Sequence, residues 1–474
     1  PKELSDSLSE EMSTNTKAIE AYNSAKYFCL DFVEKKSDLE QAKENLKTAL
    51  DQDHNFIEAY YLLSITCERL GHLEEAESLL NKGLIIAEKK NSIRGKSHIH
   101  RGFYLLYIRW GKYAQAIEHV ENALKIVMPL NNSILESQLR QDYATSLNKL
   151  QKPELSIEQN KQAVEIIQKM ENERMLGVSY ANLNDSYLLL GDFSQAIDFG
   201  EKAIAIFRKL NMPNLIAIAS NWVADAHCRI GQYEEMNIKI TEAEKLISGL
   251  NDFFREGKIE FFKSHYYLNN NDYTSALTHI DLSIDKFTLV KNTVQEIQSS
   301  IEKLKILIEA GSIEKTTIII TKIDHLINQI KGTYKNLIFV SIKYYVEAYN
   351  GATDINSIHK LLKELNDMDD FRFPLAYWYL AKTYYILEET DLSIECHQKA
   401  KTILNNECSL NSNPAHQKSF LNAFFNKRIL ADIEPMVTEE NQDTIQVFAF
   451  CPSCGYNNEG QFAFCPSCGN DLKQ

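Results

Sequence analysis

The stretch Leu188–Phe207 reads LLLGDFSQAIDFGEKAIAIF, and this stretch decides the fold of the chain. A single glycine, Gly191, separates two segments rich in helix-forming residues, as expected where one helix ends and another begins. In the second segment, Ala196 and Ala203 are seven residues apart, so they share one helix face. We therefore expect two helices joined by a tight turn, with the small side chains allowing a neighbouring helix to approach closely.

The same pattern recurs every 40 residues along the chain. Glycines occupy most positions of this lattice: Gly71, Gly111, Gly191, Gly231, Gly311 and Gly351. The other two positions hold Gln151 and Asn271, and Asn tolerates a positive φ better than most residues. Small residues at fixed offsets, such as Ala76 and Gly83, are interpreted as helix-packing positions and not as ligand contacts. The sequence predicts an all-α stack of helix pairs; the alternative is a generic helical bundle.

Leu188–Phe207 and the segment Glu68–Leu84, ERLGHLEEAESLLNKGL, resemble the tetratricopeptide repeat. That family has a period of about 34 residues, and Ala42 and Ala76 are 34 residues apart. The later, lengthened units resemble the repeats of bacterial signalling proteins, in which the array follows an ATPase, nucleotide cyclase or kinase module. The resemblance implies a right-handed α-solenoid over residues 1–404, followed by a C-terminal capping helix within residues 405–433.

Two CPSCG motifs place Cys451, Cys454, Cys465 and Cys468 near the C-terminus. Two CxxC turns supply the four thiolates that a tetrahedral structural Zn²⁺ site requires, and such a site leaves no position for a catalytic water. We predict one structural zinc ion in a zinc ribbon over residues 447–474, preceded by an acidic linker over residues 434–446. A redox dithiol pair and an iron site are the alternatives for these cysteines.

Charge and cysteine usage restrict the class of protein. The formal net charge is −14, which gives no general attraction to nucleic acid or to anionic lipid. No apolar run approaches the roughly 18 residues of a membrane span. The remaining cysteines are isolated, at Cys29, Cys67, Cys228, Cys396 and Cys408, a pattern that predicts a reducing, cytoplasmic environment.

No catalytic motif is found in the sequence. The GKS of Gly95–Ser97 would need a glycine where Lys90 stands to form a phosphate loop. HExxH, GxSxG and glycine-rich dinucleotide motifs are missing from the sequence. We expect a protein without catalytic activity.

Candidate binding residues are predicted on the first helix of each repeat, which lines the concave surface of such superhelices. A basic ladder precedes the lattice positions: Arg69, Arg109, Lys149 and Arg229. Further inward-facing candidates are Arg101, Gln141, Asp185, Asn221 and Asp225. Such a ladder would attract an acidic peptide. The alternative is that these cations are solvated and complement the dipoles of the helix ends.

The function predicted from the sequence is a non-catalytic scaffold whose concave groove binds a peptide or partner domain, with the zinc ribbon as a second contact. The alternative is the regulatory region of a larger signalling enzyme whose catalytic domain lies upstream. Nucleic-acid binding through the ribbon is a weaker alternative, because the ribbon contains no arginine. The sequence is also compatible with a homo-oligomer.

Replacing Cys454 or Cys465 by Ser should release the zinc ion and unfold only the residues after about 447, because all four thiolates are needed to close the site. Elemental analysis should give about one zinc per chain in the parent protein and none in the variant. The main helical melting transition should move by no more than a few degrees. A collapse of that transition would show that the ribbon stabilises the repeats.

Overall fold

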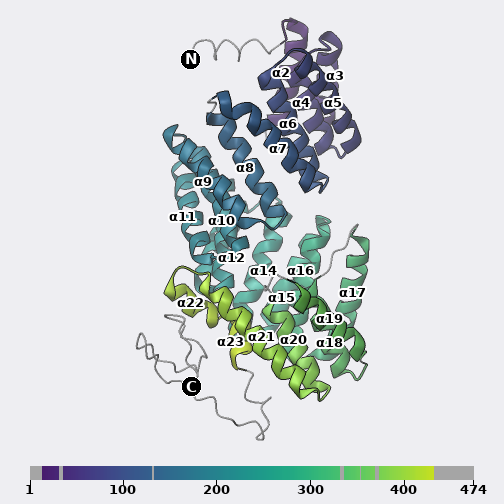
Figure 1. Ribbon diagram of the computed structural model, residues 1–474, viewed down its shortest axis with the longest axis vertical. Coiled ribbons are helices and arrows are strands. Elements are labelled where there is room, and N and C mark those ends of the chain that lie inside the picture. The colour runs from purple at the N-terminus through teal and green to yellow at the C-terminus, as the bar shows by residue number, and fades with distance from the viewer. Residues whose placement is uncertain are drawn as a thin grey trace. The chain divides into compact units, whose positions relative to one another are not determined.

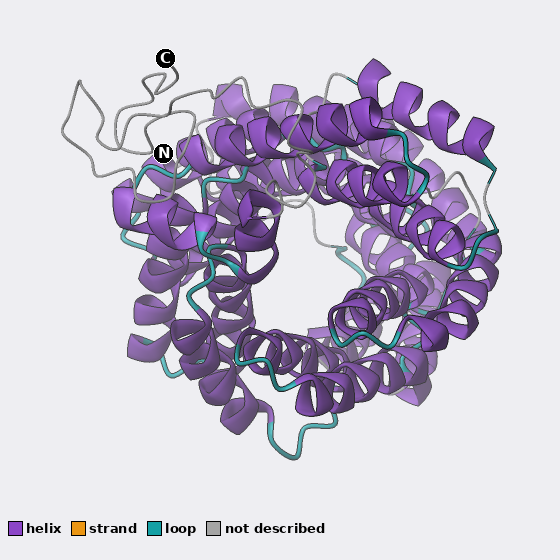
Figure 2. Ribbon diagram, turned by 90° about the horizontal axis from the view of Figure 1, so that it is seen from below, coloured by secondary structure: helices purple, strands orange, loops and turns teal. Residues whose placement is uncertain are grey.

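The computed structural model describes residues 13–30, 36–130, 133–330, 336–352, 354–368 and 373–431. Over these ranges the secondary structure consists of helices without any strand (Figure 2), which confirms the predicted all-α class. None of the described helices is both long and apolar enough to cross a membrane. The chain divides into two compact units, Pro1–Leu190 and Gly191–Gln474. Each unit is a succession of antiparallel helix pairs (Figure 1).

The helices of the first unit are α2 (Thr16–Leu30), α3 (Lys36–Gln52), α4 (Ile57–Arg69), α5 (Leu73–Lys89), α6 (Ile93–Arg109), α7 (Tyr113–Val127), η1 (Met128–Leu130), α8 (Ser133–Lys149), α9 (Pro153–Lys169) and α10 (Glu173–Leu190). Those of the second unit are α11 (Phe193–Lys209), α12 (Pro213–Arg229), α13 (Tyr233–Ile247), α14 (Phe253–Asn269), α15 (Tyr273–Leu289), α16 (Thr293–Glu309), η2 (Ile313–Lys315), α17 (Thr316–Gln329), α18 (Leu337–Tyr349), α19 (Ile355–Asp367), α20 (Pro374–Ile386), α21 (Thr390–Ser409), α22 (Pro414–Leu421) and α23 (Phe424–Ala431).

Every lattice position predicted from the sequence adopts a left-handed backbone conformation. The six glycines have φ between 72° and 93°, and the two substitutes, Gln151 and Asn271, have φ of 58° and 56°. At Gly71 the turn is closed by two backbone hydrogen bonds, from Gly71 N–H to Glu68 O (3.0 Å) and from His72 N–H to Cys67 O (2.9 Å). This pair of bonds defines a Schellman motif. The turn satisfies carbonyl groups that a helix end otherwise leaves without a partner.

A second set of turns lies midway between the lattice positions, and sequence analysis missed it. Asn91, Asn211 and Lys291 have φ of 49°, 52° and 55° and make the same pair of Schellman bonds. The structural period is therefore a single helix with its turn, and most of these helices are 17 residues long. Asparagine at several of these positions was the available signal, because it adopts a positive φ more readily than other side chains.

The residue after the left-handed position begins the next helix. Asp252 and Asp272 each accept a hydrogen bond, through the side-chain carboxylate, from the amide three residues later, at 3.0 Å in both cases. Ser92 does the same for Gly95 at 2.8 Å. A side-chain acceptor at this position satisfies one of the free N–H groups at a helix N-terminus. At these three turns, the same few residues end one helix and cap the next.

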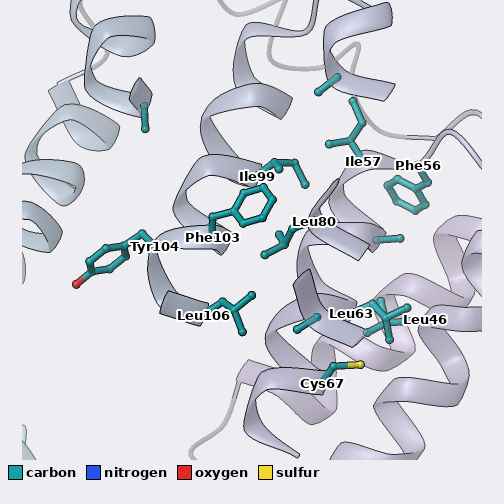
Figure 3. Close-up of a cluster of buried hydrophobic side chains, with 14 of the residues drawn as sticks. Leu46, Phe56, Ile57, Leu63, Cys67, Leu80, Ile99, Phe103, Tyr104 and Leu106 are labelled. Carbon is teal, nitrogen blue, oxygen red and sulfur yellow. The ribbon is translucent and has the colours of Figure 1, made fainter. Parts of the chain in front are cut away.

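The small residues of the lattice pack between helices, as the sequence predicts. In the first unit, a Cβ atom added to Gly83 would lie 2.6 Å from Ile99 Cδ1, and one added to Gly102 would lie 2.5 Å from Leu80 Cδ2. A side chain at either position would therefore displace the end of Ile99 or Leu80 from its place in the packing of α5 against α6. Figure 3 shows Leu80 beside Ile99 and Phe103 in this core. Their burial supplies the main hydrophobic stabilisation of the helix pair.

The shorter first repeat has a structural cause. Helix α4 has 13 residues whereas α5 and α6 have 17, which contributes to the closer spacing of Ala42 and Ala76. At the other end of the array, the turn after α20 has its left-handed residue at Glu388 and not at the next lattice position, Asp391. Helices α18, α19 and α20 also have 13 residues. The repeat length therefore changes at both ends of the regular region.

The domain boundaries expected at the C-terminal end need correction. The predicted end of the solenoid at residue 404 falls inside α21, which continues to Ser409. In place of one capping helix there are two short helices, α22 and α23. The acidic linker of residues 434–446 and the predicted ribbon of residues 447–474 lie outside the described residues.

Gly111 tests the role of the left-handed turn, because a Cβ atom added there would have no neighbour within 4 Å. Gly111→Ala should lower the free energy of unfolding by about 1 kcal/mol through backbone strain alone. Gln151→Gly relieves that strain and should raise the free energy by a smaller amount, since glycine also increases the entropy of the unfolded chain. Urea denaturation measures both effects. Equal stability of Gly111→Ala and the parent protein would contradict this explanation.

Candidate binding cavity on the inner helices of the second unit

Alternate helices of the second unit line a cavity of about 270 Å³. Its walls come from α12, α14, α16 and the N-terminal end of α18, which are the first helices of successive pairs. The cavity therefore belongs to the helices on which binding residues were predicted. Five charged side chains line it: Asp225, Arg229, Lys258, Glu302 and Lys305. Phe261, Phe262, Ile301 and Ile338 provide the apolar part of the wall.

Asp225 and Arg229 form an ion pair one helical turn apart on α12. Arg229 Nε lies 2.9 Å from Asp225 Oδ1. Burial acts to raise the pKa of Asp225, but the positive charges of Arg229 and Lys258 outweigh it and lower the pKa. Asp225 is therefore a carboxylate at neutral pH, and much of the charge of Arg229 is neutralised locally.

Glu302 is the most deeply buried charged group of the cavity, with 5 % of its surface exposed. Its Oε2 atom lies 2.5 Å from Lys305 Nζ, but its Oε1 atom has no hydrogen-bond partner. The Nε2 atom of His265 lies 3.7 Å from Oε1 and is also without a hydrogen-bond partner. Burial acts to raise the pKa of Glu302, but Lys305 and His265 lower it overall, whereas burial lowers the pKa of His265. Glu302 is therefore an ionised carboxylate of the cavity wall with one oxygen that accepts no hydrogen bond.

Lys258 is the cation of the cavity that lacks an acidic partner within the described part of the chain. Its Nζ atom lies 6.0 Å from the centre of the Phe261 ring, and no carboxylate is within ion-pairing distance among the described residues. Burial lowers its pKa, an effect that Asp225 opposes. An ammonium group in this environment gains from an added anion.

A C-terminal clasp, residues 410–431, lies across turns of the second unit that come about 200 residues earlier in the chain (Figure 1). The side chain of Asn411 accepts a hydrogen bond from Phe193 N–H at 3.1 Å. His416 Nδ1 lies 2.9 Å from Ser194 Oγ. Asn411 is fully buried, and it satisfies a free N–H group in the first turn of α11.

The clasp continues past the next turn. Tyr233 Oη accepts a hydrogen bond from Phe424 N–H at 3.1 Å. A Cβ atom added to Gly231 would lie 2.8 Å from Ala423 Cα, so only glycine leaves room for the clasp here. The lattice glycine thus has two roles at this position, a left-handed turn and a close approach.

The far end of the clasp contacts the inner helices. Arg428 forms an ion pair with Glu309, the last residue of α16. The ammonium group of Lys305 lies 4.4 Å from the centre of the Phe425 ring, within the range of a cation–π interaction. His397 Nε2 lies 2.7 Å from the carbonyl oxygen of Ile429. Lys305 therefore connects the cavity to the clasp.

The structure places the predicted ladder residues of the first unit in contacts between repeats. Arg109 Nε lies 3.2 Å from Glu68 Oε1, and Arg101 Nε lies 2.7 Å from Asp142 Oδ2. In both pairs the partners come from successive first helices, α4 with α6 and α6 with α8. These cations have local acidic partners, which weakens the case for an uninterrupted basic ladder.

The other predicted residues differ in their surroundings. Gln141 donates to Ser179 Oγ at 2.6 Å, and Asp185 accepts from Asn148 at 3.0 Å, again between successive first helices. Arg69 and Lys149 are exposed at helix ends. Asn221 of α12 is buried, and its Oδ1 atom has no hydrogen-bond partner.

Of the predicted residues, the structure places Asp225 and Arg229 on the cavity wall, and sequence analysis missed Lys258, His265, Glu302 and Lys305. A signal for two of these was available. His265 and Lys305 follow Asp225 by 40 and 80 residues, so they occupy the same position in the next two repeats. Glu302 and Lys258 had no such signal, because the same helix positions hold apolar residues in the preceding repeat.

Two other motifs in the sequence are the GKS of Gly95–Ser97 and the two CPSCG motifs. Gly95–Ser97 lies within the first turns of α6, with Ser97 fully buried in the helix packing, so it does not form a phosphate loop. The four ribbon cysteines lie outside the described residues. Within those residues, no group of three or more His, Cys, Asp or Glu side chains could hold a metal ion.

The comparisons with known proteins agree with this architecture. Residues 35–92 match the sequence profile of the tetratricopeptide repeat. No curated protein sequence matches the chain. A Rap protein complexed with competence and sporulation factor is similar in structure, with a TM-score of 0.57 at 13% identity, covering 75% of this chain and 99% of that one. The fold is a tetratricopeptide-type superhelix.

Two further solved structures share the fold. The apo form of RapI has a TM-score of 0.50 at 16% identity, and the match covers 58% of this chain and 99% of that chain. Aspartyl phosphate phosphatase F from Bacillus subtilis has a TM-score of 0.50 at 15% identity, covering 69% of this chain and 98% of that chain. At such identities the similarity establishes the fold alone.

Asn411→Ala tests the clasp, because it leaves the buried Phe193 N–H group without an acceptor. The free energy of unfolding should fall by about 1–2 kcal/mol, and the Phe193 amide should exchange its hydrogen faster. Ser412→Ala, at the exposed neighbouring position, is the control and should change neither quantity. If the two variants behave alike in urea denaturation and hydrogen exchange, the clasp does not stabilise the second unit.

Proposed function

We propose that this protein is a non-catalytic interaction scaffold that binds a peptide, or an extended segment of a partner protein, against the inner helices of its second unit. The observation that carries the proposal is the cavity between α12, α14, α16 and α18. It combines an apolar wall with an ammonium group, Lys258, that has no acidic partner among the described residues, and a carboxylate oxygen, Glu302 Oε1, that accepts no hydrogen bond. Binding sites typically combine apolar surface with a few such polar groups.

The architecture supports the proposal. A superhelix of helix pairs presents a preformed surface along successive first helices, so a ligand can bind with little ordering of the protein. The Rap protein of similar fold is complexed with competence and sporulation factor, which shows that a superhelix of this kind can hold a ligand. In the first unit, by contrast, most predicted inner residues already bond to the next repeat.

The CPSCG pairs support a second contact module. We propose that Cys451, Cys454, Cys465 and Cys468 bind one structural zinc ion. The acidic residues 434–446 would then connect this ribbon to the clasp, which ends at Ala431. A protein partner suits this module better than nucleic acid, because the net charge of the chain is −14.

The alternative role, regulation of a catalytic domain in a longer polypeptide, shares the same binding step. The two roles differ in their consequence: a scaffold only joins partners, whereas a regulatory array changes a second activity when its ligand binds. The cavity supports peptide binding, the step that both roles share. We therefore propose peptide binding as the primary function.

Selection of random peptides displayed on phage, with the full chain as bait, tests the proposal. Enriched peptides should bind the parent protein in fluorescence anisotropy and bind Gln298→Trp at least about 10-fold more weakly. Gln298 is exposed at the cavity wall, so the indole should fill the cavity without disturbing the core. The control is Ile318→Trp, because Ile318 on α17 is 79% exposed and is not part of the cavity wall. Peptides that bind both variants equally would place the site elsewhere.

A further inference from the structure

We propose that the cavity selects an amphoteric ligand, one that presents an anionic group to Lys258 and an N–H or ammonium donor to Glu302. This inference rests on the proposed function, because it names the ligand chemistry of the same site. It also departs from the acidic peptide that the basic ladder suggested. The matching chemistry is that of a small zwitterion, or of a peptide segment with an acidic and a basic side chain close together.

The anionic half of the ligand is required by Lys258. Three cations line the cavity, but Arg229 is already paired with Asp225 at 2.9 Å and Lys305 with Glu302 at 2.5 Å. Lys258 is left without an acidic partner among the described residues. A partly buried ammonium group is stabilised most by an anion that replaces its lost hydration.

The donor half is required by Glu302. Its Oε1 atom is buried and accepts no hydrogen bond, and the adjacent His265 Nε2 atom, 3.7 Å away, is also unpaired. A buried carboxylate oxygen without a donor is costly, and one donor removes that cost. A ligand N–H group at this position would bond to Glu302 directly.

The fixed acids argue against a purely acidic ligand. Asp225 and Glu302 line the same cavity as Lys258, so a ligand with only negative groups would approach two carboxylates. A purely cationic ligand would meet Arg229, Lys258 and Lys305 in the same way. Like charges at short range in a partly buried site repel strongly. Only a ligand with both signs complements Lys258 and Glu302 together.

The size of the cavity favours a small group. Its volume of about 270 Å³ is just below the range for ligand pockets, roughly 300–1,000 Å³. It suits a few heavy atoms that carry both charges, with any longer chain continuing outside along the inner helices. The two side chains that would bind the ligand's charged groups lie on successive first helices, Lys258 on α14 and Glu302 on α16.

Zwitterions of graded length test the inference on the full chain. The probes are glycine, beta-alanine, gamma-aminobutyrate and epsilon-aminocaproate, compared with butyrate and butylamine, which carry one charge each. Saturation-transfer NMR and calorimetry should show at least one zwitterion binding about 10-fold more tightly than either single-charge compound. Lys258→Met and Glu302→Gln should each abolish that preference. Lys245→Met, an exposed lysine on α13, is the matched control and should leave it unchanged.

A second set of probes distinguishes the source of the ligand. Acetyl-Lys-Glu-amide carries both charges on side chains and has no free termini, whereas acetyl-Glu-Glu-amide carries only acids. Preference for the first dipeptide indicates a peptide segment, and binding of free zwitterions alone indicates a small metabolite. If thermal melting shows that Glu302→Gln does not fold, the binding test uses Glu302→Asp instead. This variant keeps the carboxylate but shortens the side chain by one methylene group.

Two results would overturn the inference. One is equal binding of single-charge and zwitterionic probes, and the other is no saturation by any zwitterion or by the mixed dipeptide up to about 10 mM. In either case, peptides selected on phage that depend on the cavity would still support the scaffold function. The inference and the proposed function can therefore fail separately.

Discussion

The left-handed turn with its two backbone hydrogen bonds is the constraint on which the rest of this structure depends. At Gly71 the bonds run from residues 71 and 72 back to residues 68 and 67, and the same geometry recurs at Asn91, Gly111 and beyond. Because the turn takes so few residues, each helix must reverse at once and pack against its predecessor. The helix length then sets the size of the repeat. The regular spacing also places Gly83 and Gly102 where neighbouring helices pack closely.

This regular register aligns polar side chains on successive first helices. In the first unit most of them bond to one another across the repeats, as Arg101 does to Asp142 and Asn148 to Asp185. Such contacts satisfy groups that would otherwise be partly buried without partners. In the second unit, Lys258 has no acidic partner among the described residues and Glu302 Oε1 accepts no hydrogen bond. Both groups lie on the cavity wall.

The clasp adds a long-range constraint that a simple repeat array lacks. Stacked repeats are held mainly by their neighbours in sequence, but Asn411 bonds to the first turn of α11 and Arg428 to the end of α16. These contacts join the end of the second unit to its beginning. They also bring Phe425 against Lys305, a residue of the cavity wall. The stability of the clasp and the position of that ammonium group are therefore physically connected.

The sequence by itself determined the all-α class, the lattice of left-handed turns and the packing role of the small residues. Each of these depends on local chemistry: glycine at positive φ, and alanine or glycine where helices approach, as at Gly111 and Ala196. It also identified α12 as a helix that carries cavity residues, through Asp225 and Arg229. It could not show that Arg109 and Arg101 are neutralised by Glu68 and Asp142, because pairing depends on side-chain positions in the next repeat. Only the tertiary structure revealed the cavity with the free Oε1 atom of Glu302 and the clasp, since both depend on contacts between residues far apart in the chain, whose partners no local pattern specifies.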